Sequence, residues 1–275
     1  MLILAATPIG NLADASPRLR QTLAMATVIA AEDTRKTKQL LQLLEITTAA
    51  KLIAVHDHNE KDKAEQLAQL AATSDVVLVS DAGMPTVSDP GYRVVAAAVL
   101  AEVPITVIPG PSAPVTALAL SGMATDRFAF EGFLPRKTND LTRTLSALKD
   151  DPRTLIFFEA PQRITVTLEQ LAKIFGPERP VAICRELTKR YEEVLRGTAA
   201  ELARELQQRQ LKGEIVLVVA GATPQVMTAE LAYQQVAERV AAGERLKDAC
   251  RAVAASTGAS ARELYDLALA NKGGK

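Results

Sequence analysis

The sequence has few of the residues that mark metal centres, disulfide scaffolds or membrane spans. Its 275 residues include two cysteines, Cys184 and Cys250, and no Cys-x-x-Cys pair. This usage suits a reducing compartment and argues against a cysteine-rich zinc site. No apolar run is long enough to cross a membrane, and the chain begins with an apparent strand rather than the charged start of a signal peptide. We therefore expect a soluble, cytoplasmic protein.

Two common nucleotide-binding motifs are also missing. The lack of Gly-x-x-x-x-Gly-Lys-Ser/Thr argues against a P-loop nucleoside triphosphatase, and the loop at residues 7–12 is not the Gly-x-Gly-x-x-Gly of ordinary dinucleotide binding. Neither sign of charge dominates, because the chain has 32 basic and 32 acidic side chains. This balance identifies no partner, although it leaves room for a local basic patch.

What the sequence does contain is a fivefold alternation of short apolar runs and helical segments in its first 120 or so residues. Short, nearly all-apolar strands that alternate with helices are typical of a parallel sheet covered on both faces. The pattern predicts strands at residues 2–6, 28–31, 51–55, 76–79 and 105–108.

Each of these predicted strands ends in polar residues, Gly or Pro. Because the carboxyl ends of parallel strands meet at one edge of a sheet, five such loops predict a binding cleft there. The longest loop, residues 80–91, could by itself equally be a rigid connector with capping Asp residues. Asp33, Asp57, Asp81 and Asp89 fall in these loops, which favours a sulfonium or amine ligand over a polyphosphate.

The second half of the chain predicts another α/β domain, residues 124–224, after an N-terminal domain of residues 1–123. Its expected strands are residues 127–130 with an exit turn at 132–135, then 154–158, 181–184, 193–196 and 215–219. Those around residues 181–196 lie too close together for a helix between them, so we expect a mixed sheet. The predicted fold class is thus two α/β domains, the first with a five-stranded parallel sheet.

Residues 225–275 are predicted to form a third, helical domain. Two amphipathic stretches, 229–241 and 246–255, precede Gly258, and Ser260 with Glu263 forms a capping box that opens a last helix. Helix, tight turn and capped helix resemble a helix-turn-helix. A helical appendage packed on the body of the protein explains the same pattern equally well.

Taken together, the loops resemble those of one family. The motifs that carry the resemblance are Thr7-Pro8-Ile9-Gly10-Asn11-Leu12, Glu32-Asp33-Thr34-Arg35, Ser80-Asp81-Ala82-Gly83, Ser88-Asp89-Pro90-Gly91, Pro109-Gly110-Pro111-Ser112-Ala113, Gly132-Phe133-Leu134-Pro135, Glu159-Ala160-Pro161-Gln162-Arg163 and Arg185-Glu186-Leu187-Thr188-Lys189. In this order and spacing they are similar to the tetrapyrrole methylase superfamily, and within it to the branch of ribosomal RNA small subunit methyltransferases I. The resemblance covers residues 2–221, and the helical tail is similar to the C-terminal domain of that branch.

The resemblance implies an interdomain cleft that holds S-adenosylmethionine, and usually a homodimer. It also implies 2′-O-methylation of a cytidine in the decoding region of 16S rRNA. We expect the partner to be 16S rRNA in the assembled small ribosomal subunit, because contacts to RNA shape and phosphates need folded RNA. By motif position, the cofactor residues would be Pro8, Asp81, Gly83, Asp89, Ser112 and Ala113 from the first domain, with Glu186, Leu187, Thr188, Gly213 and Glu214 from the second.

A ribose hydroxyl is a poor nucleophile, so a positioned base would help this reaction. The candidates are Asp33, Glu159 and Lys189, and the absence of any protein base is the fourth possibility. Each candidate also has an ordinary structural interpretation. Asp33 could cap a helix, Glu159 could pair with Arg163, and Lys189 could be a solvated surface charge.

Basic residues of both domains could line a track for RNA phosphates, although any of them could equally be ordinary surface charge. With 4% aromatic residues and no Trp, we do not expect a broad platform on which bases stack. The stretch His56-Asp57-His58 is expected to make polar contacts to substrate, and no metal site is predicted. The residues of the predicted track are Arg35, Lys36, Arg136, Lys137, Arg163, Arg185, Lys189 and Arg190.

Two other classes of function fit the same motifs. One is a methyltransferase of the superfamily that acts on a porphyrinoid or a protein side chain. The other is a non-catalytic RNA-binding assembly factor that has kept the fold. The helical tail and the basic loops of the second domain argue against a small-molecule enzyme, and cofactor binding by the isolated protein would separate an enzyme from an assembly factor.

Overall fold

The computed structural model describes residues 1–56, 58–223 and 229–272. The chain divides into two compact units, Met1–Ala220 and Gly221–Lys275, and each is described by itself. The first unit contains two β-sheets, one built from residues before Pro109 and the other from residues after Arg127. The domain boundaries at residues 123 and 224 remain predictions.

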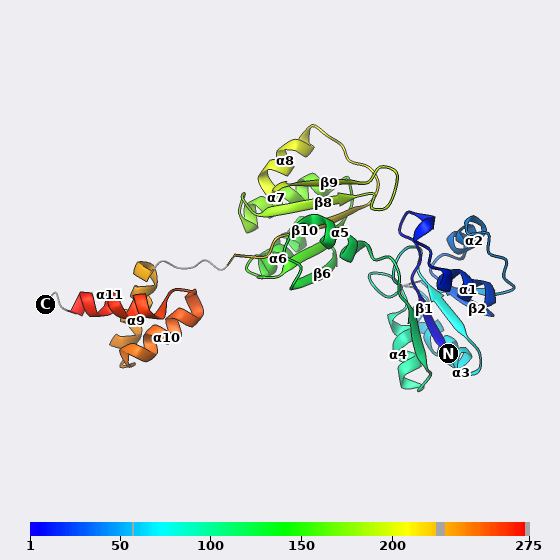
Figure 1. Ribbon diagram of the computed structural model, residues 1–275, viewed down its shortest axis with the longest axis horizontal. Helices are drawn as coiled ribbons and strands as arrows, with labels where there is room; N and C mark the ends of the chain where they lie inside the picture. The colour runs from blue at the N-terminus through cyan, green and yellow to red at the C-terminus, as the bar shows by residue number, and fades with distance from the viewer. Residues whose placement is uncertain (57, 224–228, 273–275) are drawn as a thin grey trace. The chain divides into compact units, whose positions relative to one another are not determined.

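The first sheet has five parallel strands in the order β3-β2-β4-β1-β5. Its strand β1 begins at the N-terminus of the chain (Figure 1). Its central strand β4 has the sequence VVLV and is buried along its whole length, because helices cover both faces of the sheet. This confirms the predicted five-stranded parallel sheet, with strand ends within one residue of those expected. The strands are β1 (Leu2–Ala5), β2 (Val28–Ala31), β3 (Lys51–Ala54), β4 (Val76–Val79) and β5 (Ile105–Ile108).

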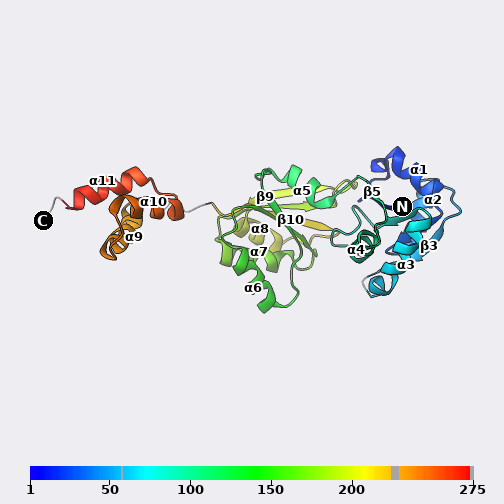
Figure 2. The same ribbon diagram turned by 90° about the horizontal axis from the view of Figure 1, so that it is seen from below.

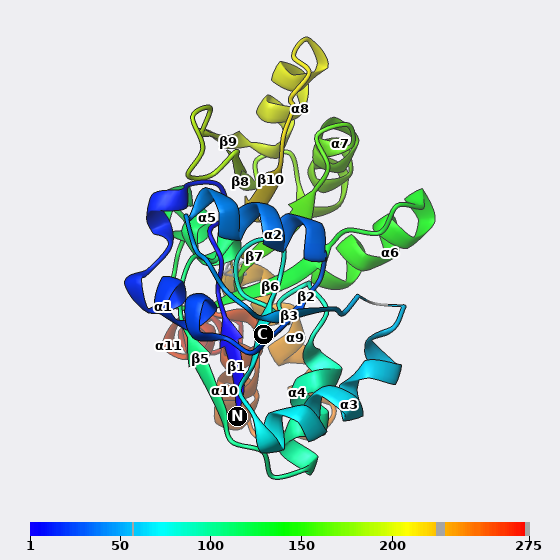
Figure 3. The same cartoon turned by 90° about the vertical axis from the view of Figure 1, so that its right-hand side faces the viewer.

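Helices cover this sheet in two pairs, with α1 and α2 on one side and α3 and α4 on the other (Figure 3). Leu19, Leu23 and Leu41 form the core under the first pair, and Leu67 and Val94 belong to the core under the second. Apolar side chains recur at helical spacing, so each helix presents one apolar face to the sheet. The elements are η1 (Leu12–Asp14), α1 (Pro17–Met25), α2 (Thr34–Leu43), α3 (Glu60–Thr73) and α4 (Tyr92–Leu100).

The second sheet is mixed, as predicted, and its strand order is β6-β7-β10-β8-β9. Strands β6 and β7 are parallel, whereas β10 runs antiparallel to both β7 and β8. The expected exit turn after residue 130 is instead a continuation of β6, which reaches Phe133 through an irregularity in register. The strands are β6 (Phe128–Phe133), β7 (Thr154–Glu159), β8 (Pro180–Arg185), β9 (Glu193–Thr198) and β10 (Ile215–Val219).

Helices α6 (Thr138–Leu148), α7 (Ile164–Phe175) and α8 (Ala199–Gln207) share one hydrophobic core with the second sheet. A different core lies around α5 (Ala113–Ser121), which follows β5 in the chain. Ala117 and Leu118 of α5 pack against strands β7, β8 and β10. The chain therefore passes from the first sheet to the second through a helix that packs on the second.

The second unit contains α9 (Ala229–Ala241), α10 (Leu246–Thr257) and α11 (Ala261–Lys272), which pack together around Val236, Val253 and Leu264 (Figure 2). Gly258 ends α10 with φ of +72°, and the Ser260 hydroxyl accepts a hydrogen bond from the Glu263 N–H at 3.3 Å. The turn and cap expected between the last two helices are therefore present. Among the residues described, no helix is long and apolar enough to cross a membrane.

Candidate functional site

A cavity of about 430 Å³ lies between the two sheets of the first unit. Clefts of this size hold small molecules and cofactors. Residues from loops and from the ends of strands and of α5 line it. They are Ile9, Glu32, Asp81, Ala82, Gly83, Met84, Val87, Ser88, Asp89, Ser112, Ala113 and Pro114 on the first side, and Phe133, Phe158, Glu159, Ala160, Pro161, Cys184, Leu187, Gly213, Glu214, Ile215 and Val216 on the second.

Parallel strands bring the first set together, because β1, β4 and β2 are neighbours and their carboxyl ends share one edge. The loop after β1 pairs with the loop after β4 through two backbone hydrogen bonds. The Thr7 N–H donates to the Gly83 carbonyl at 2.9 Å, and the Gly83 N–H donates back at 3.0 Å. Gly83 has φ of +80°, a conformation that glycine adopts without the strain other residues would carry.

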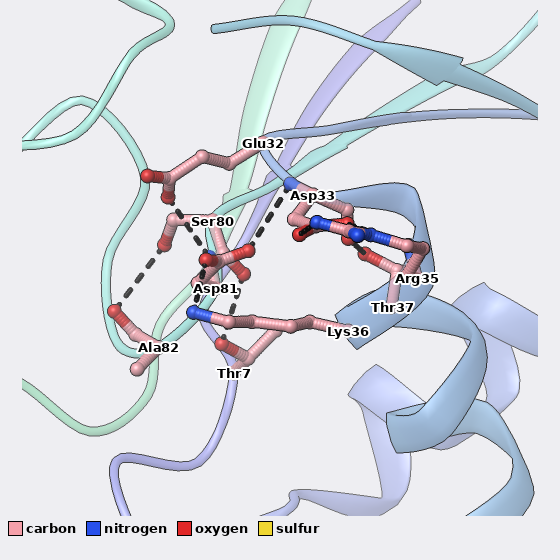
Figure 4. Close-up of polar contacts among 9 residues, drawn as sticks. All are labelled: Thr7, Glu32, Asp33, Arg35, Lys36, Thr37, Ser80, Asp81 and Ala82. Atoms are coloured by element: carbon pink, nitrogen blue, oxygen red, sulfur yellow. Dashed lines mark hydrogen bonds and ion pairs between the residues drawn. The ribbon is translucent and has the colours of Figure 1, made fainter.

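Asp81 joins the loops after β2 and β4 (Figure 4). Its carboxylate accepts from the Asp33 N–H at 3.1 Å and from the Lys36 ammonium at 2.7 Å. Its own N–H donates to the Glu32 carboxylate at 3.2 Å. The hydrogen bond to Asp81 is the main cause of the raised pKa of Lys36, so Lys36 keeps its ammonium form at neutral pH.

Asp33 caps helix α2, which is the structural role that the sequence offered as the alternative to a role as base. Its carboxylate accepts from the Arg35 N–H at 2.8 Å and pairs with the Arg35 guanidinium at 2.8 Å. The hydrogen bond from that side chain lowers the pKa of Asp33 to about 2. Because a general base works best with a pKa near the working pH, Asp33 in this arrangement is a weak candidate. Its side chain is not among the groups that line the cavity within the described residues.

The second sheet contributes through a reversal of direction. Strand β10 runs antiparallel to β7 and β8, so Ile215 at its start lies opposite both Glu159 and Arg185 at their ends. Gly213 and Glu214 before β10 therefore meet the loops that follow β7 and β8. Three segments of the second half converge on one edge in this way, although only two of them follow a strand.

Lys189 connects two of these segments. Its ammonium contacts the carboxylates of Glu186 at 2.7 Å and Glu214 at 2.8 Å. Burial disfavours the charged forms of both Lys189 and Glu186. The hydrogen bonds to the two carboxylates nevertheless raise the pKa of Lys189. The hydrogen bonds from Lys189 and from the Glu214 N–H lower the pKa of Glu186. A lysine held in its ammonium form cannot accept a proton, so the geometry favours a positioning role for Lys189 over a role as base.

Glu159 is the candidate base that lines the cavity and is buried, with its side chain 1% exposed. Its carboxylate accepts from the Thr167 hydroxyl at 2.6 Å and from the Ala160 N–H at 2.8 Å, and Arg163 lies 3.4 Å away. The expected pair with Arg163 is therefore present. Two oxygens have about four acceptor sites, so this carboxylate keeps capacity for one more donor.

The first loop of the chain abuts the loop after β8. A Cβ on Gly10 would lie 2.9 Å from the Thr188 hydroxyl and 3.0 Å from the Leu187 carbonyl, so only glycine fits this approach. The Thr188 hydroxyl oxygen is buried and has no hydrogen-bond partner among the described residues. An unpaired buried polar atom costs about 1–3 kcal/mol, and such groups occur where a ligand or water completes the network.

Backbone strain gathers in two loops beside the cavity, those after β4 and β8. Thr86 and Ser88 in the loop after β4, and Glu186 and Thr188 in the loop after β8, have φ between +51° and +75°. Such conformations cost about 1–3 kcal/mol each and cluster at ligand sites, where the surrounding structure holds them in place. Both loops supply residues to the cavity.

The charge and polarity of the lining suit S-adenosylmethionine. Apart from the Cys184 thiol, whose pKa burial raises to about 11, every ionisable side chain among the described lining residues is a carboxylate. Carboxylates stabilise a sulfonium or ammonium and repel phosphates. Apolar groups such as Ile9, Met84 and Leu187 offer surface for an adenosine ring.

The cavity brings together most of the predicted cofactor residues. Pro8, Glu186 and Thr188 are not among those that line it, although each is next to a residue that does. The assignments of cofactor, base and RNA residues all remain predictions. Those that line the cavity are Asp81, Gly83, Asp89, Ser112, Ala113, Leu187, Gly213 and Glu214.

Glu32, Phe133 and Phe158 line the cavity but are not among the site residues predicted from the sequence. Glu32 is the first residue after β2, so its position at a strand end was a usable signal. Phe133 and Phe158 lie inside strands, where an aromatic residue ordinarily indicates core packing. Cys184 is buried in β8, and it also borders the cavity.

The cations of the predicted phosphate track differ in what they contact. Arg136 and Lys137 are exposed and form no ion pair with the described residues, whereas Arg190 lies 5.6 Å over the ring of Tyr191. The others contact carboxylates or carbonyls of the protein, which reduces their availability to phosphate. They are Arg35 to Asp33, Lys36 to Asp81, Arg163 to Glu159, Arg185 to Glu193, and Lys189 to Glu186 and Glu214.

Metal binding finds no support in the part of the chain that the structure describes. No group of three or more His, Cys, Asp or Glu side chains is arranged to hold a metal ion within the described ranges. His56 and His58 lie edge to face with ring centroids 6.1 Å apart. Asp57, which the sequence analysis placed among the acids of the cleft, falls outside the described residues.

Comparison with known proteins identifies the family. Residues 1–203 match the family of Tetrapyrrole (Corrin/Porphyrin) Methylases. The chain is 46% identical to the ribosomal RNA small subunit methyltransferase I of Mycobacterium tuberculosis (strain ATCC 25618 / H37Rv), over 98% of this chain and 95% of that protein.

Solved structures share the fold at low sequence identity. The methyltransferase CobJ has a TM-score of 0.60 at 19% identity, over 80% of this chain and 94% of CobJ. Uroporphyrin-III C-methyltransferase from Thermus thermophilus, solved with S-adenosyl homocysteine, has a TM-score of 0.54 at 16% identity, over 80% of this chain and 96% of that one. The chain belongs to the tetrapyrrole methylase family and, within it, to the ribosomal RNA small subunit methyltransferases I.

Proposed function

We propose that this protein transfers a methyl group from S-adenosylmethionine to the 2′-hydroxyl of a cytidine in the decoding region of 16S rRNA. The observation that carries the cofactor assignment is the acid-lined cavity at the edge of both sheets. The names of the close relatives carry the ribosomal RNA assignment. The position and chemistry of the methylated atom come from the sequence resemblance.

When bound, S-adenosylmethionine supplies an electrophilic methyl group on a positively charged sulfur. The carboxylates of Asp81, Asp89 and Glu214 would stabilise that charge, and backbone around Gly83 and Gly213 would allow close approach. Much of the rate would come from holding the ribose hydroxyl in line with the methyl group. The protein's task is then to orient both molecules and to keep water out.

The hydroxyl must also lose its proton during transfer. Glu159 is the candidate that the cavity supports best, because it lines the space while Asp33 is paired to Arg35 and Lys189 is held as an ammonium. Glu159 is already a partner of Thr167 and Arg163, so a structural role alone would explain its burial. Replacement by Gln preserves the shape and removes the base, which separates the two roles.

We further propose that the protein acts in the cytoplasm, as a homodimer, on the assembled small subunit. A decisive experiment uses purified protein, labelled S-adenosylmethionine, and small subunits or free 16S rRNA from cells that lack the gene. Label on a decoding-region ribose supports the proposal, and sedimentation of the protein alone reports the oligomeric state. Tight cofactor binding without label on any RNA would contradict it and would direct the search to small-molecule acceptors.

A further inference from the structure

Phe133 borders the cavity yet is 68% exposed. Aromatic side chains bury large areas when they pack, so a ring left open beside a ligand cavity has surface to offer a partner. Tyr92, a similarly exposed aromatic residue at 72%, lies elsewhere, on α4. The location of Phe133, rather than its exposure alone, therefore distinguishes it.

A β-bulge places Phe133 at the cavity. Phe130 pairs with Ile156 and Phe133 pairs with Phe158, so β6 advances by three residues while β7 advances by two. Gly132, with φ of +69°, lies in the bulge. Without the extra residue, position 132 would lie opposite Phe158. Bulges of this kind commonly redirect a side chain next to an active site.

The ring of Phe133 is supported from within the protein. Its centroid lies 5.2 Å from that of Phe158, which lines the cavity, and Phe158 in turn packs edge to face on Phe130 at 4.9 Å. Aromatic pairs in such tilted arrangements are mutually stabilising. A supported ring loses less entropy when a planar group stacks on it.

The chain just after Phe133 is also anchored. The Arg163 guanidinium donates to the Leu134 carbonyl at 3.2 Å and to the Pro135 carbonyl at 2.7 Å. Arg163 is itself paired with the buried Glu159. The loop that presents Phe133 is thus tied to the same carboxylate that lines the cavity.

Arg136 and Lys137 follow at once, exposed and free of ion pairs to the described residues. Three residues of chain span at most about 11 Å, so Arg136 remains close to the mouth of the cavity. The carboxylates inside the cavity repel phosphates, whereas these two cations outside attract them. A nucleotide at the mouth would therefore keep its phosphates outside the cavity.

We propose that Phe133 is the surface on which the base at or next to the methylated nucleotide stacks, while Arg136 and Lys137 contact the neighbouring phosphates. This inference rests on the proposed function and adds an RNA subsite to it. It agrees with the sequence-based expectation that no broad platform stacks the bases, because it assigns the stacking to a single supported ring. Stacking suits every base, so Phe133 positions the nucleotide without selecting it.

The test compares four variants of the full chain: Phe133→Ala, Phe133→Trp, Arg136→Ala/Lys137→Ala and Tyr92→Ala. Two affinities are measured for each, one for S-adenosylmethionine by calorimetry and one for undermethylated small subunits in the presence of S-adenosylhomocysteine. We expect Phe133→Ala to weaken subunit binding about tenfold or more without changing cofactor affinity. Phe133→Trp should bind subunits about as tightly as the wild type. In the Arg136→Ala/Lys137→Ala variant, subunit affinity should depend less on salt concentration.

Two outcomes would overturn the inference. Equal loss of cofactor and subunit affinity in Phe133→Ala would assign the ring to the cofactor, and behaviour like that of Tyr92→Ala would assign it no role. Methyl transfer by the wild-type protein decides the proposed function separately. A wild type that transfers no methyl group to RNA, while Phe133→Ala still weakens subunit binding, would refute the proposed function and leave the RNA subsite standing.

Discussion

The two sheets of the first unit deliver residues to the same cavity by different routes. In the parallel sheet, β1, β2 and β4 all end at one edge, so a polar residue placed after a strand reaches the site by topology alone. In the mixed sheet, the ends of β7 and β8 meet the beginning of β10. In a parallel sheet, the place of a residue after a strand is therefore enough to predict that it lies at the site. In a mixed sheet, the pairing of the strands must be known as well.

The charged groups of the two edges differ in the same way. On the first edge, Lys36 pairs with Asp81 while its side chain remains 62% exposed. On the second edge, Lys189 is 28% exposed and bridges two carboxylates, and Glu159 is buried. Water screens exposed pairs strongly, so the second edge should depend more on its polar contacts.

The largest effect should come from Gly213→Ala, on the second edge. Gly213 has φ of +92°, and a Cβ there would collide with the Glu186 side chain that Lys189 and the Glu214 N–H hold in place. We expect a loss of about 3 kcal/mol in unfolding free energy, from backbone strain and displaced hydrogen bonds, measured by urea denaturation. The substitution should also displace Glu214, which lines the cavity, and so weaken binding of S-adenosylmethionine.

Gly122→Ala is the matched control for this prediction. Gly122 has φ of +78°, but a Cβ there would meet nothing within 4 Å. Gly122→Ala should lower the unfolding free energy by about 1–2 kcal/mol, the strain of a left-handed residue with a Cβ. Its affinity for the cofactor should not change. Equal losses in the two variants would mean that the contact with Glu186 contributes nothing.

Thr167→Val should follow in size. The Thr167 hydroxyl donates to the buried carboxylate of Glu159 at 2.6 Å, and valine removes that donor without changing the shape. Because hydrogen bonds to charged groups contribute about 1.5–3 kcal/mol, we expect a loss of about 2 kcal/mol in unfolding free energy. Thr165→Val, on the same helix, removes a longer bond to the Leu206 carbonyl at 3.4 Å and should lose less than half as much.

Lys189→Met should lower the unfolding free energy by about 1 kcal/mol at pH 7, because it removes the bridge between Glu186 and Glu214. The pKa of Glu186 is lowered in the folded protein, so its contribution is present above the ordinary value of 4.5 and is lost as pH falls through the folded pKa. The pKa of Lys189 is raised, so its contribution is present below 10.5 and is lost as pH rises through the folded pKa.

The difference between wild type and Lys189→Met should therefore be largest between these two values and shrink in acid. Urea denaturation at pH 7 and at pH 3 measures it. A difference that stays constant with pH would show that the charge of Lys189 does not cause it.

The smallest effect should come from Lys36→Met on the first edge. Its pair with Asp81 is exposed, and such pairs contribute about 0–1 kcal/mol. We expect a loss below about 0.5 kcal/mol, close to that of Lys38→Met on the same helix. A loss as large as that of Lys189→Met would remove the distinction between the two edges.

The strands and most helix limits could be predicted from the sequence, because apolar runs and caps are local features. Residues 28–31, 105–108 and 215–219 were expected as strands and are strands at those limits. Ser16 stands directly before Pro17, a pattern typical of a helix start, and it caps α1 with its hydroxyl accepting from the Leu19 N–H at 3.1 Å. Short-range sequence patterns suffice for such features.

Parts of the candidate site could not be predicted, because they depend on contacts between distant residues. Whether Asp33 faces a ligand or Arg35 depends on side-chain geometry rather than on its place after a strand. The position of the Lys189 ammonium depends on its hydrogen bond to Glu214, which is 25 residues away in the chain. Phe133 reaches the cavity through a β-bulge, and the residues of β6 alone give only a weak signal for that bulge.

The sequence by itself determined the order of strands and helices in each half, the acidic and Gly-rich loops, and the family. These follow from residue types at short spacing, which set local backbone preferences and burial. Only the tertiary structure decided which charges are paired, which loops share the cavity and which aromatic ring stands open beside it. Those features arise from packing between segments far apart in the chain, and no local pattern encodes them.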